Sequence, residues 1–279
     1  MRYDRPQTIA DAAAALAAGD ARALAGGTDL LVRLGREQGW PAGLVDLKSL
    51  PELQGIEVRE DALSVGAAAP LADLHAHPAL AAWPALAEAL RVFAARAIRE
   101  RATLGGNLAN ASPAADTVPP LIVYGAQAVT TRRVLPVEEV ATGPGRTQLE
   151  AGEIITAVEI PRPPVGAVSV LHKLAFRDAM AIAVVNVAVQ LELEGRVVRE
   201  ARIALGAVAP TVIRAHAAEE ALVGKPLGAA SIAACAAAAA ADCAPIDDLR
   251  GTAAYRRTMV ERILVYRLGR FASANPASS

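Results

Sequence analysis

The segment TLGGNLANASPAADTVPPL, residues 103–121, restricts the possible folds more than any other part of the sequence. It holds a single charged residue and no aromatic residue, and nearly all of its side chains are small. Gly105 and Gly106 lie near its start, and a second glycine pair, Gly26 and Gly27, lies in LAGGTDLL. Glycine permits tight turns and lets a ligand approach main-chain N–H groups, which together can bind an anion. One pair alone indicates a tight turn, whereas two pairs, each leading into Thr or Asn, favour a ligand.

The common phosphate-binding and catalytic patterns are absent from the sequence. Neither glycine run reads GxGxxG and no GxxxxGK[ST] occurs, so the Rossmann and P-loop fingerprints are missing. GxSxG, HExxH and a cysteine–histidine arrangement are missing too. His75 and His77 form an HxH pair without a third ligand nearby, which indicates a surface helix end rather than a metal site. The sequence therefore shows no acid–base or nucleophilic catalysis by its own side chains.

Composition and charge exclude several classes of protein. The 279 residues carry a formal net charge of −1, which argues against electrostatic binding of nucleic acid. Apolar stretches are too short and too alanine-rich to span a bilayer, and MRYDRPQT lacks the apolar core of a signal peptide, so a cytoplasmic protein is expected. Cys235 and Cys243 lie in one helical segment roughly 12 Å apart, beyond the ~7 Å that a disulfide allows.

Periodicity and turn residues predict an α+β chain, with a mixed sheet in its first part and a three-strand meander plus helices in its second. Helices are expected at 7–18, 84–102, 214–223, 229–242 and 252–272, strands at 22–25, 42–50, 152–161, 168–176, 181–193 and 197–208, and hairpins at 55–69 and 125–140. The segment 103–121 is expected to be a loop. RPPVGA, residues 162–167, is rich enough in proline and glycine to be a domain boundary.

Four motifs in order then resemble one known family. They are AGGTDLL, the run 103–121, GEIITAVEIPRP and FRDAMAIAVVNVAV, and the likeness extends from YDRPQTIADAAAAL to APIDDLRGTAAYRRTMVERILVYRL. This combination resembles the FAD-binding (medium) subunits of molybdenum hydroxylases, which include xanthine dehydrogenase and carbon monoxide dehydrogenase. The resemblance implies a PCMH-type FAD-binding domain at residues 1–165 and a flavoprotein C-terminal domain, with a three-stranded antiparallel sheet and helices, at 168–274.

The resemblance also implies which residues bind FAD. The first glycine run would wrap the diphosphate, and the second would face the dinucleotide. Asp116 would bind the sugar-adenosine part of the cofactor, while Phe93, Ile155 and Lys173 match further positions of the family. The implied cofactor residues are Ala23, Leu24, Ala25, Gly26, Gly27, Thr28, Asp29, Leu30, Phe93, Thr103, Leu104, Gly105, Gly106, Asn107, Asp116, Ile155 and Lys173.

The implied function is electron transfer within a larger complex. Electrons would pass from a molybdopterin-binding large subunit through a 2Fe-2S small subunit to this FAD, and then to NAD or another acceptor. The arginine-bearing segment 91–101 is one candidate docking surface. NASPAADTVPPL favours the xanthine dehydrogenase branch. A carbon monoxide dehydrogenase-like, aldehyde- or N-heterocycle-oxidising enzyme, a flavin-free assembly module and a stand-alone flavin oxidase remain alternatives.

Overall fold

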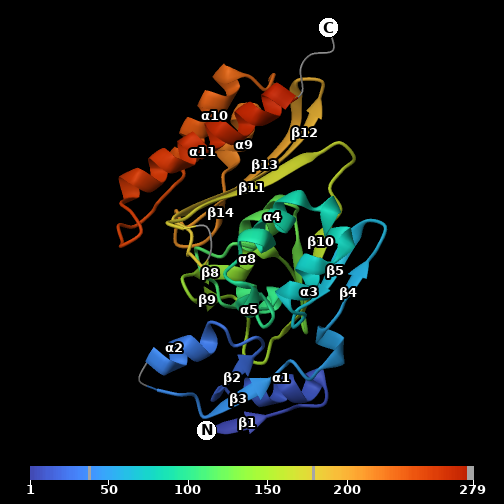
Figure 1. Ribbon diagram of the computed structural model, residues 1–279. Coiled ribbons are helices and arrows are strands. Elements are labelled where there is room, and N and C mark those ends of the chain that lie inside the picture. Colours follow the sequence, from blue (N-terminus) through green and yellow to red (C-terminus); the bar gives the residue numbers. More distant parts are fainter. Residues whose placement is uncertain (37–38, 178–179, 275–279) are drawn as a thin grey trace. The chain divides into compact units, whose positions relative to one another are not determined.

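A computed structural model describes residues 1–36, 39–177 and 180–274, and the chain forms two compact units (Figure 1). Unit 1 contains Met1–Leu80, Ala94–Ser112 and Gly125–Pro161. Unit 2 contains Ala81–Phe93, Pro113–Tyr124 and the chain from Arg162 onward. Because these segments alternate along the sequence, neither unit is a continuous stretch of chain.

The first sheet of unit 1 is parallel. Its strands are β1 (Arg2–Asp4), β3 (Gly43–Asp46) and β2 (Ala21–Leu24), in that order, with helices α1 (Ile9–Ala17) and α2 (Leu30–Arg36) in the connections. Thr8 caps α1, as predicted, because its side chain accepts a hydrogen bond from the main-chain N–H of Asp11 at 3.1 Å. Ala12 of α1 and Val45 of β3 are fully buried in the core of this layer.

The second sheet of unit 1 is antiparallel. Its strands, in order, are β4 (Ile56–Val58), β5 (Ala62–Gly66), β10 (Ile155–Pro161), β6 (Gln127–Thr130) and β7 (Val134–Pro136). The remaining elements of unit 1 are α3 (Leu71–Ala76), α5 (Arg96–Arg99), α6 (Leu104–Ala109), α8 (Val137–Val140), β8 (Ala141–Gly143), β9 (Arg146–Thr147) and a short 3₁₀ turn at 51–53, and a second 3₁₀ turn at 78–82 spans the passage from unit 1 to unit 2. Helix α6 packs against β5 and β10, so the second glycine run lies beside the central strands.

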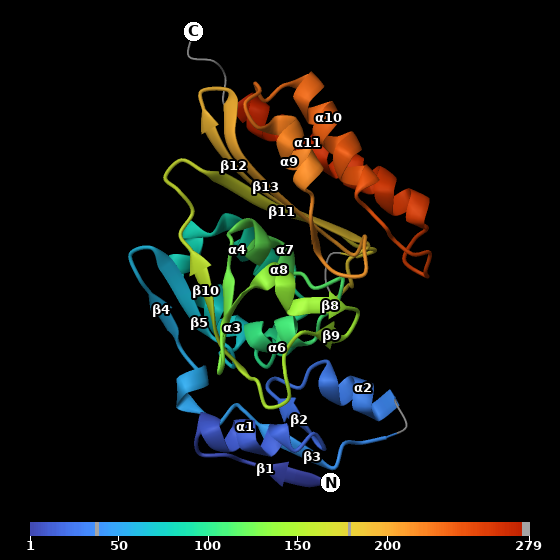
Figure 2. The same ribbon diagram turned by 180° about the vertical axis from the view of Figure 1, so that it is seen from behind.

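Unit 2 is built on an antiparallel sheet with helices on both faces (Figures 1 and 2). The strands are β11 (Val168–Leu174), β12 (Val185–Glu194), β13 (Val197–Gly206) and β14 (Ile213–Arg214). Helices α9 (His216–Leu222), α10 (Ala229–Ala241) and α11 (Ala253–Ala274) cover one face, and α4 (Pro84–Val92) and α7 (Val118–Val123) cover the other. Odd-numbered residues of β12, such as Val187, point to the α9–α11 core, so even-numbered residues point to α4 and α7.

The α+β class and most predicted elements are confirmed, with four corrections. The first part holds a parallel three-stranded sheet, an antiparallel five-stranded sheet and the small β8–β9 pair rather than one mixed sheet, because helical connections join the parallel strands whereas hairpins contribute to the antiparallel sheet. The helix predicted at 84–102 ends at Val92, and a second helix starts at Arg96. Ala94 between them has φ +41°, which interrupts the helix where the chain passes from unit 2 to unit 1.

The segment predicted as a loop, 103–121, contains α6 and most of α7. Thr103 caps α6, and prolines in the first turn of α7 have the φ value that a helix start requires. The C-terminal sheet has a fourth strand, β14, which is only two residues long and so leaves no alternating pattern in the sequence. In the described segments no helix is both long and apolar enough to cross a membrane.

Candidate cofactor site

The first glycine run forms the turn between β2 and α2 in unit 1. Gly27 has φ +72°, a conformation that favours glycine, and its carbonyl accepts the N–H of Leu31 at 3.1 Å. Within the described residues, the main-chain N–H groups of Gly26, Gly27, Thr28 and Asp29 donate to no protein acceptor. The turn therefore offers four consecutive N–H donors, the kind of backbone arrangement that binds anions.

The second glycine run uses its amides inside the protein. Thr103 Oγ1 accepts the N–H of Gly106 at 3.0 Å, and the carbonyl of Thr103 accepts the N–H of Asn107 at 3.0 Å. The N–H of Gly105 donates to the carbonyl of Ala67 at 3.1 Å. Of the two runs, the first therefore offers the row of amides without a protein acceptor among the described residues, whereas three amides of the second run bind acceptors inside the protein.

Both runs are brought together in unit 1, and close packing explains two of the four glycines. A Cβ on Gly26 would lie 1.8 Å from the carbonyl oxygen of Arg101, and one on Gly105 would lie 2.7 Å from that of Ala67. By contrast, a Cβ on Gly106 would meet only the Thr103 hydroxyl at 2.8 Å and the Cβ of Ala25 at 3.8 Å. Gly106 is thus the glycine of the second run that no backbone atom of the protein forbids from carrying a side chain.

The other predicted residues of unit 1 have mixed surroundings. Ala23 lies exposed in β2, and Asp29 pairs with Arg33 at 2.9 Å on the surface. Four of the predicted residues have side chains that pack in the hydrophobic core: Leu24, Leu30, Leu104 and Ile155. Any contact of Leu24, Leu30 or Leu104 with a ligand is therefore expected to involve main-chain atoms.

In unit 2 the structure joins Asp116 and Lys173 in a buried ion pair. Lys173 Nζ lies 2.6 Å from Asp116 Oδ2, and the side chains are 5% and 10% exposed. The ammonium also donates to the carbonyl of Val92 at 3.2 Å. Since an ammonium has three N–H groups, one donor of Lys173 remains without an acceptor among the described residues. Phe93, the C-cap residue of α4, follows Val92 and is half-buried.

Burial governs the electrostatics of this pair. Desolvation raises the pKa of Asp116, and the charge and hydrogen bond of Lys173 oppose that effect. The carboxylate keeps acceptor capacity beyond these contacts, because among the described residues Oδ1 receives one long hydrogen bond, from Asn186 Nδ2 at 3.4 Å. Asp116 and Lys173 can therefore offer both an acceptor and a cationic donor to a polar ligand.

Asn186 is part of this cluster but is not among the site residues predicted from the sequence. Its side chain is fully buried, and Nδ2 also donates to the carbonyl of Ala115 at 3.3 Å. The sequence does contain a signal for it, because a lone amide inside the apolar strand sequence VVNVAV needs a buried hydrogen-bonding partner.

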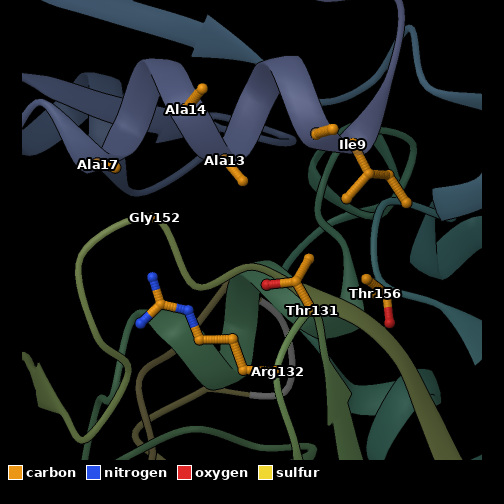
Figure 3. Close-up of a pocket in the computed structure, with 9 residues that line it drawn as sticks. Ile9, Ala13, Ala14, Ala17, Thr131, Arg132, Gly152 and Thr156 are labelled. Atoms are coloured by element: carbon orange, nitrogen blue, oxygen red, sulfur yellow. The ribbon is translucent and has the colours of Figure 1, made fainter.

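An open groove of about 620 Å³ lies elsewhere in unit 1 (Figure 3). Ile9 and Ala13 of α1 face Thr131 and Arg132 across it, and the lining is Ile9, Ala10, Ala13, Ala14, Ala17, Thr131, Arg132, Gly152 and Thr156. None of the predicted cofactor residues lines this groove. Arg132 pairs with Glu150 and donates to the carbonyl of Ala151, so its charge is already matched. In the parts of the chain that are described, no group of three His, Cys, Asp or Glu side chains could hold a metal ion.

Comparisons with known proteins identify the family. Residues 1–163 match the FAD binding domain in molybdopterin dehydrogenase, and residues 171–270 match the CO dehydrogenase flavoprotein C-terminal domain. The chain is 34% identical over 274 residues to the xanthine dehydrogenase FAD-binding subunit of Escherichia coli O157:H7, covering 94% of each chain. It is 33% identical over 271 residues to the carbon monoxide dehydrogenase medium chain of Hydrogenophaga pseudoflava, covering 95% of this chain and 94% of the relative.

Solved structures agree with these sequence matches. Carbon monoxide dehydrogenase from Hydrogenophaga pseudoflava superimposes with a TM-score of 0.94 at 34% identity, and quinoline 2-oxidoreductase from Pseudomonas putida 86 with 0.91 at 31%. Each superposition covers 99% of this chain and 98% of the other. The chain therefore belongs to the family of FAD-binding subunits of molybdenum hydroxylases, a group of oxidoreductases, and its cofactor is FAD.

Proposed function

We propose that the chain is the FAD-carrying electron-transfer subunit of a xanthine dehydrogenase-like molybdenum hydroxylase. In this proposal it takes electrons from the 2Fe-2S clusters of a small subunit, which a molybdopterin-binding large subunit reduces, and passes them to NAD or another acceptor. The relatives are named as a FAD-binding subunit and a medium chain, which supports a role as one part of a multi-subunit enzyme. The domain boundaries at 165 and 168 belong to this proposal.

The observation that carries the proposal is the set of unpaired polar groups at positions that the family uses. The four free amides of residues 26–29 suit a diphosphate, which carries its charge on oxygen acceptors. Asp116 suits a sugar hydroxyl, and Lys173 adds a buried cation with a spare donor. The residues present therefore fit FAD.

The remaining predicted residues complete the proposed site. Thr28 and Thr103 would supply hydroxyls, the half-buried Phe93 would supply apolar surface, and Gly106 leaves room beside the second run, while the Ile155 side chain contributes to the core. FAD, when bound, would supply the redox chemistry of the site, because the cofactor accepts and releases the electrons. The protein's own contribution is to bind the cofactor, orient it and exclude water.

Gly106 provides the test. The full-length chain is purified, its flavin is removed, and FAD binding is measured by flavin fluorescence for the native chain, Gly106→Val and Gly269→Val. Gly269 lies in α11, and a Cβ there meets no atom within 4 Å, so it controls for placing valine at a helical glycine. We expect Gly106→Val to weaken binding by more than about a hundredfold, or about 2.7 kcal/mol, while Gly269→Val binds as the native chain does.

Two results would contradict the proposal. A folded Gly106→Val chain with native FAD affinity would remove the second run from the site. If the native chain never binds FAD, the flavin-free assembly module becomes the better hypothesis.

A carbon monoxide dehydrogenase-like function is the second candidate, since the structural match to that enzyme has a TM-score of 0.94. Co-expression with molybdopterin-binding and iron–sulfur subunits from the same genome distinguishes the two. We expect the assembled complex to reduce NAD or a dye with a purine substrate, and the chain alone to oxidise no organic substrate. Reduction by carbon monoxide instead of a purine would assign the chain to the second candidate.

A further inference from the structure

Three neighbouring strands of unit 2 place Lys173, Asn186 and Gly206 in one cross-strand row. Lys173 of β11 is the register partner of Asn186 of β12, which is in turn the partner of Gly206 of β13. All three belong to the face of the sheet that α4 and α7 cover. Asp116 lies over this row, 2.6 Å from Lys173 Nζ and 3.4 Å from Asn186 Nδ2.

The amide of Asn186 is held through its nitrogen. Its Nδ2 donates to the carbonyl of Ala115 and to Asp116 Oδ1, so it holds two consecutive residues of the turn above the sheet. Its Oδ1 is buried and has no hydrogen-bond partner within the described structure. A Cβ on Gly206 would lie 1.9 Å from that oxygen, so the glycine makes the space that the amide occupies.

We propose that Asn186 is a positioning residue for the flavin site, which holds the Asp116 carboxylate so that Asp116 in turn orients the Lys173 ammonium toward FAD. The inference rests on the proposed function, in which Asp116 and Lys173 bind the cofactor. Asp116 and the carbonyl of Val92 take two of the three N–H groups of Lys173, and this fixes the direction of the third. A shift of Asp116 would therefore redirect the donor that is left for FAD.

The neutral amide also sets the charge of the cluster. Lys173 is the charged group that faces Asp116 from β11, while β12 contributes the uncharged Asn186 and β13 contributes Gly206. Helix α4 contributes the main-chain carbonyl of Val92, and its two charged residues, Glu88 and Arg91, pair with each other at 3.0 Å, while α7 contributes apolar residues. His172 and Arg267 interact on the opposite face of β11. A second carboxylate at position 186 would share one lysine with Asp116 in a site with little water.

The test is the pH dependence of FAD binding by the flavin-free full-length chain. In Asn186→Asp the new carboxyl replaces the amide with a group of the same shape. Near pH 5.5 we expect one of the two carboxyls to be protonated, because neighbouring buried carboxylates resist full ionisation, and FAD affinity should stay within about threefold of the native value. Near pH 8 both should be ionised and affinity should fall by about tenfold or more.

Gln190→Glu is the matched control. Gln190 is buried on the same face of β12, but its register partners are Ser169 and Arg202, so its carboxylate would not touch Asp116. Its FAD dissociation constant should therefore vary with pH as in the native chain. A merely structural effect of burying a carboxyl in β12 would make the two variants behave alike, and that result would overturn the inference.

Two further variants keep the outcomes separate. Gly206→Ala displaces the amide without adding charge, so it should weaken FAD binding about tenfold at every pH, and it replaces Asn186→Asp if that chain does not fold. Native affinity in a folded Gly206→Ala chain counts against the inference. Lys173→Met tests the proposed function itself: native FAD affinity there would remove Lys173 from the site. If Lys173→Met binds FAD weakly, Lys173 stays in the site. If the FAD affinities of Asn186→Asp and Gln190→Glu then depend on pH in the same way, only the positioning role of Asn186 is refuted.

Discussion

Replacing Glu153 by glutamine should destabilise unit 1 in a pH-dependent way. The side chain of Glu153 is 0% exposed and accepts hydrogen bonds from four protein donors. These are Arg133 Nε at 3.0 Å and Nη2 at 3.1 Å, Thr130 Oγ1 at 2.8 Å and the main-chain N–H of Glu150 at 2.8 Å. The carboxylate thus joins the β6–β7 turn to the loop that leads into β10.

The hydrogen bond from Arg133, opposed by burial and aided by the other donors, lowers the pKa of Glu153 from 4.5 to about 2. That interval corresponds to about 3.4 kcal/mol at about 1.36 kcal/mol per pH unit. Because the Arg133 side chain is 36% exposed, water screens part of the interaction, and we expect a loss of about 2 kcal/mol at neutral pH. Since the folded-state pKa is lowered, this stabilisation is complete above about 4.5 and is lost as pH falls toward about 2.

Urea unfolding of the native chain and Glu153→Gln, followed at several pH values, measures the difference. The two free energies of unfolding should differ by about 2 kcal/mol at neutral pH and converge as pH falls toward about 2. Glu159→Gln on β10 is the control. Glu159 binds Ser64 and the half-exposed Arg59, so its loss should cost about 1 kcal/mol or less. A difference for Glu153→Gln that stays constant from neutral to acid pH would refute the reasoning.

Three further outcomes follow from described contacts. Arg256→Met should cost about 3–5 kcal/mol in urea unfolding, because the buried guanidinium, 2.5 Å from Asp248, also donates to two main-chain carbonyls. Ala111→Gly should raise stability by up to about 1 kcal/mol, because φ at this residue is +47°, whereas Ala109→Gly, within α6, should lower it by about 1 kcal/mol; thermal unfolding that ranked these two the other way round would be contrary evidence. Both cysteines should resist a thiol reagent at about pH 8 until the chain unfolds, because burial raises their pKa values to about 12 and about 11; fast labelling of the folded chain would contradict this.

Most elements of the fold could be predicted from residues that lie close together in the sequence. The cap at Thr8, the strand that ends at Pro161 and the turn at residues 194–196 each depend on residues close in sequence, and each appears in the structure. The break at Ala94 has no such signal, because alanine favours a helix and neither glycine nor proline lies nearby. It depends on the passage of the chain between units, which no local pattern encodes.

The candidate site could be predicted only in part for the same reason. Glycine pairs are visible in a sequence, but whether they serve a ligand or close packing depends on contacts such as that between Gly26 and Arg101, which are distant in the chain. The neighbours of Asn186 depend on strand register, and a shift by one residue would turn its side chain to the other face of the sheet. Asp116 and Lys173 were predicted as site residues because the sequence resembles a known family, whereas the ion pair between them is seen only in the structure.

The alternation of the two units along the chain limits how this protein can be divided. A cut near residue 165 would leave α4 and α7 on the N-terminal fragment, although both belong to unit 2. The C-terminal fragment would then expose the sheet face that carries Lys173 and Asn186, and it should aggregate unless the other fragment is supplied in trans. During synthesis, too, α4 and α7 leave the ribosome before the first strand of the sheet that they cover, β11, which begins at Val168, so the nascent chain must keep two apolar helices uncovered until that sheet has been made.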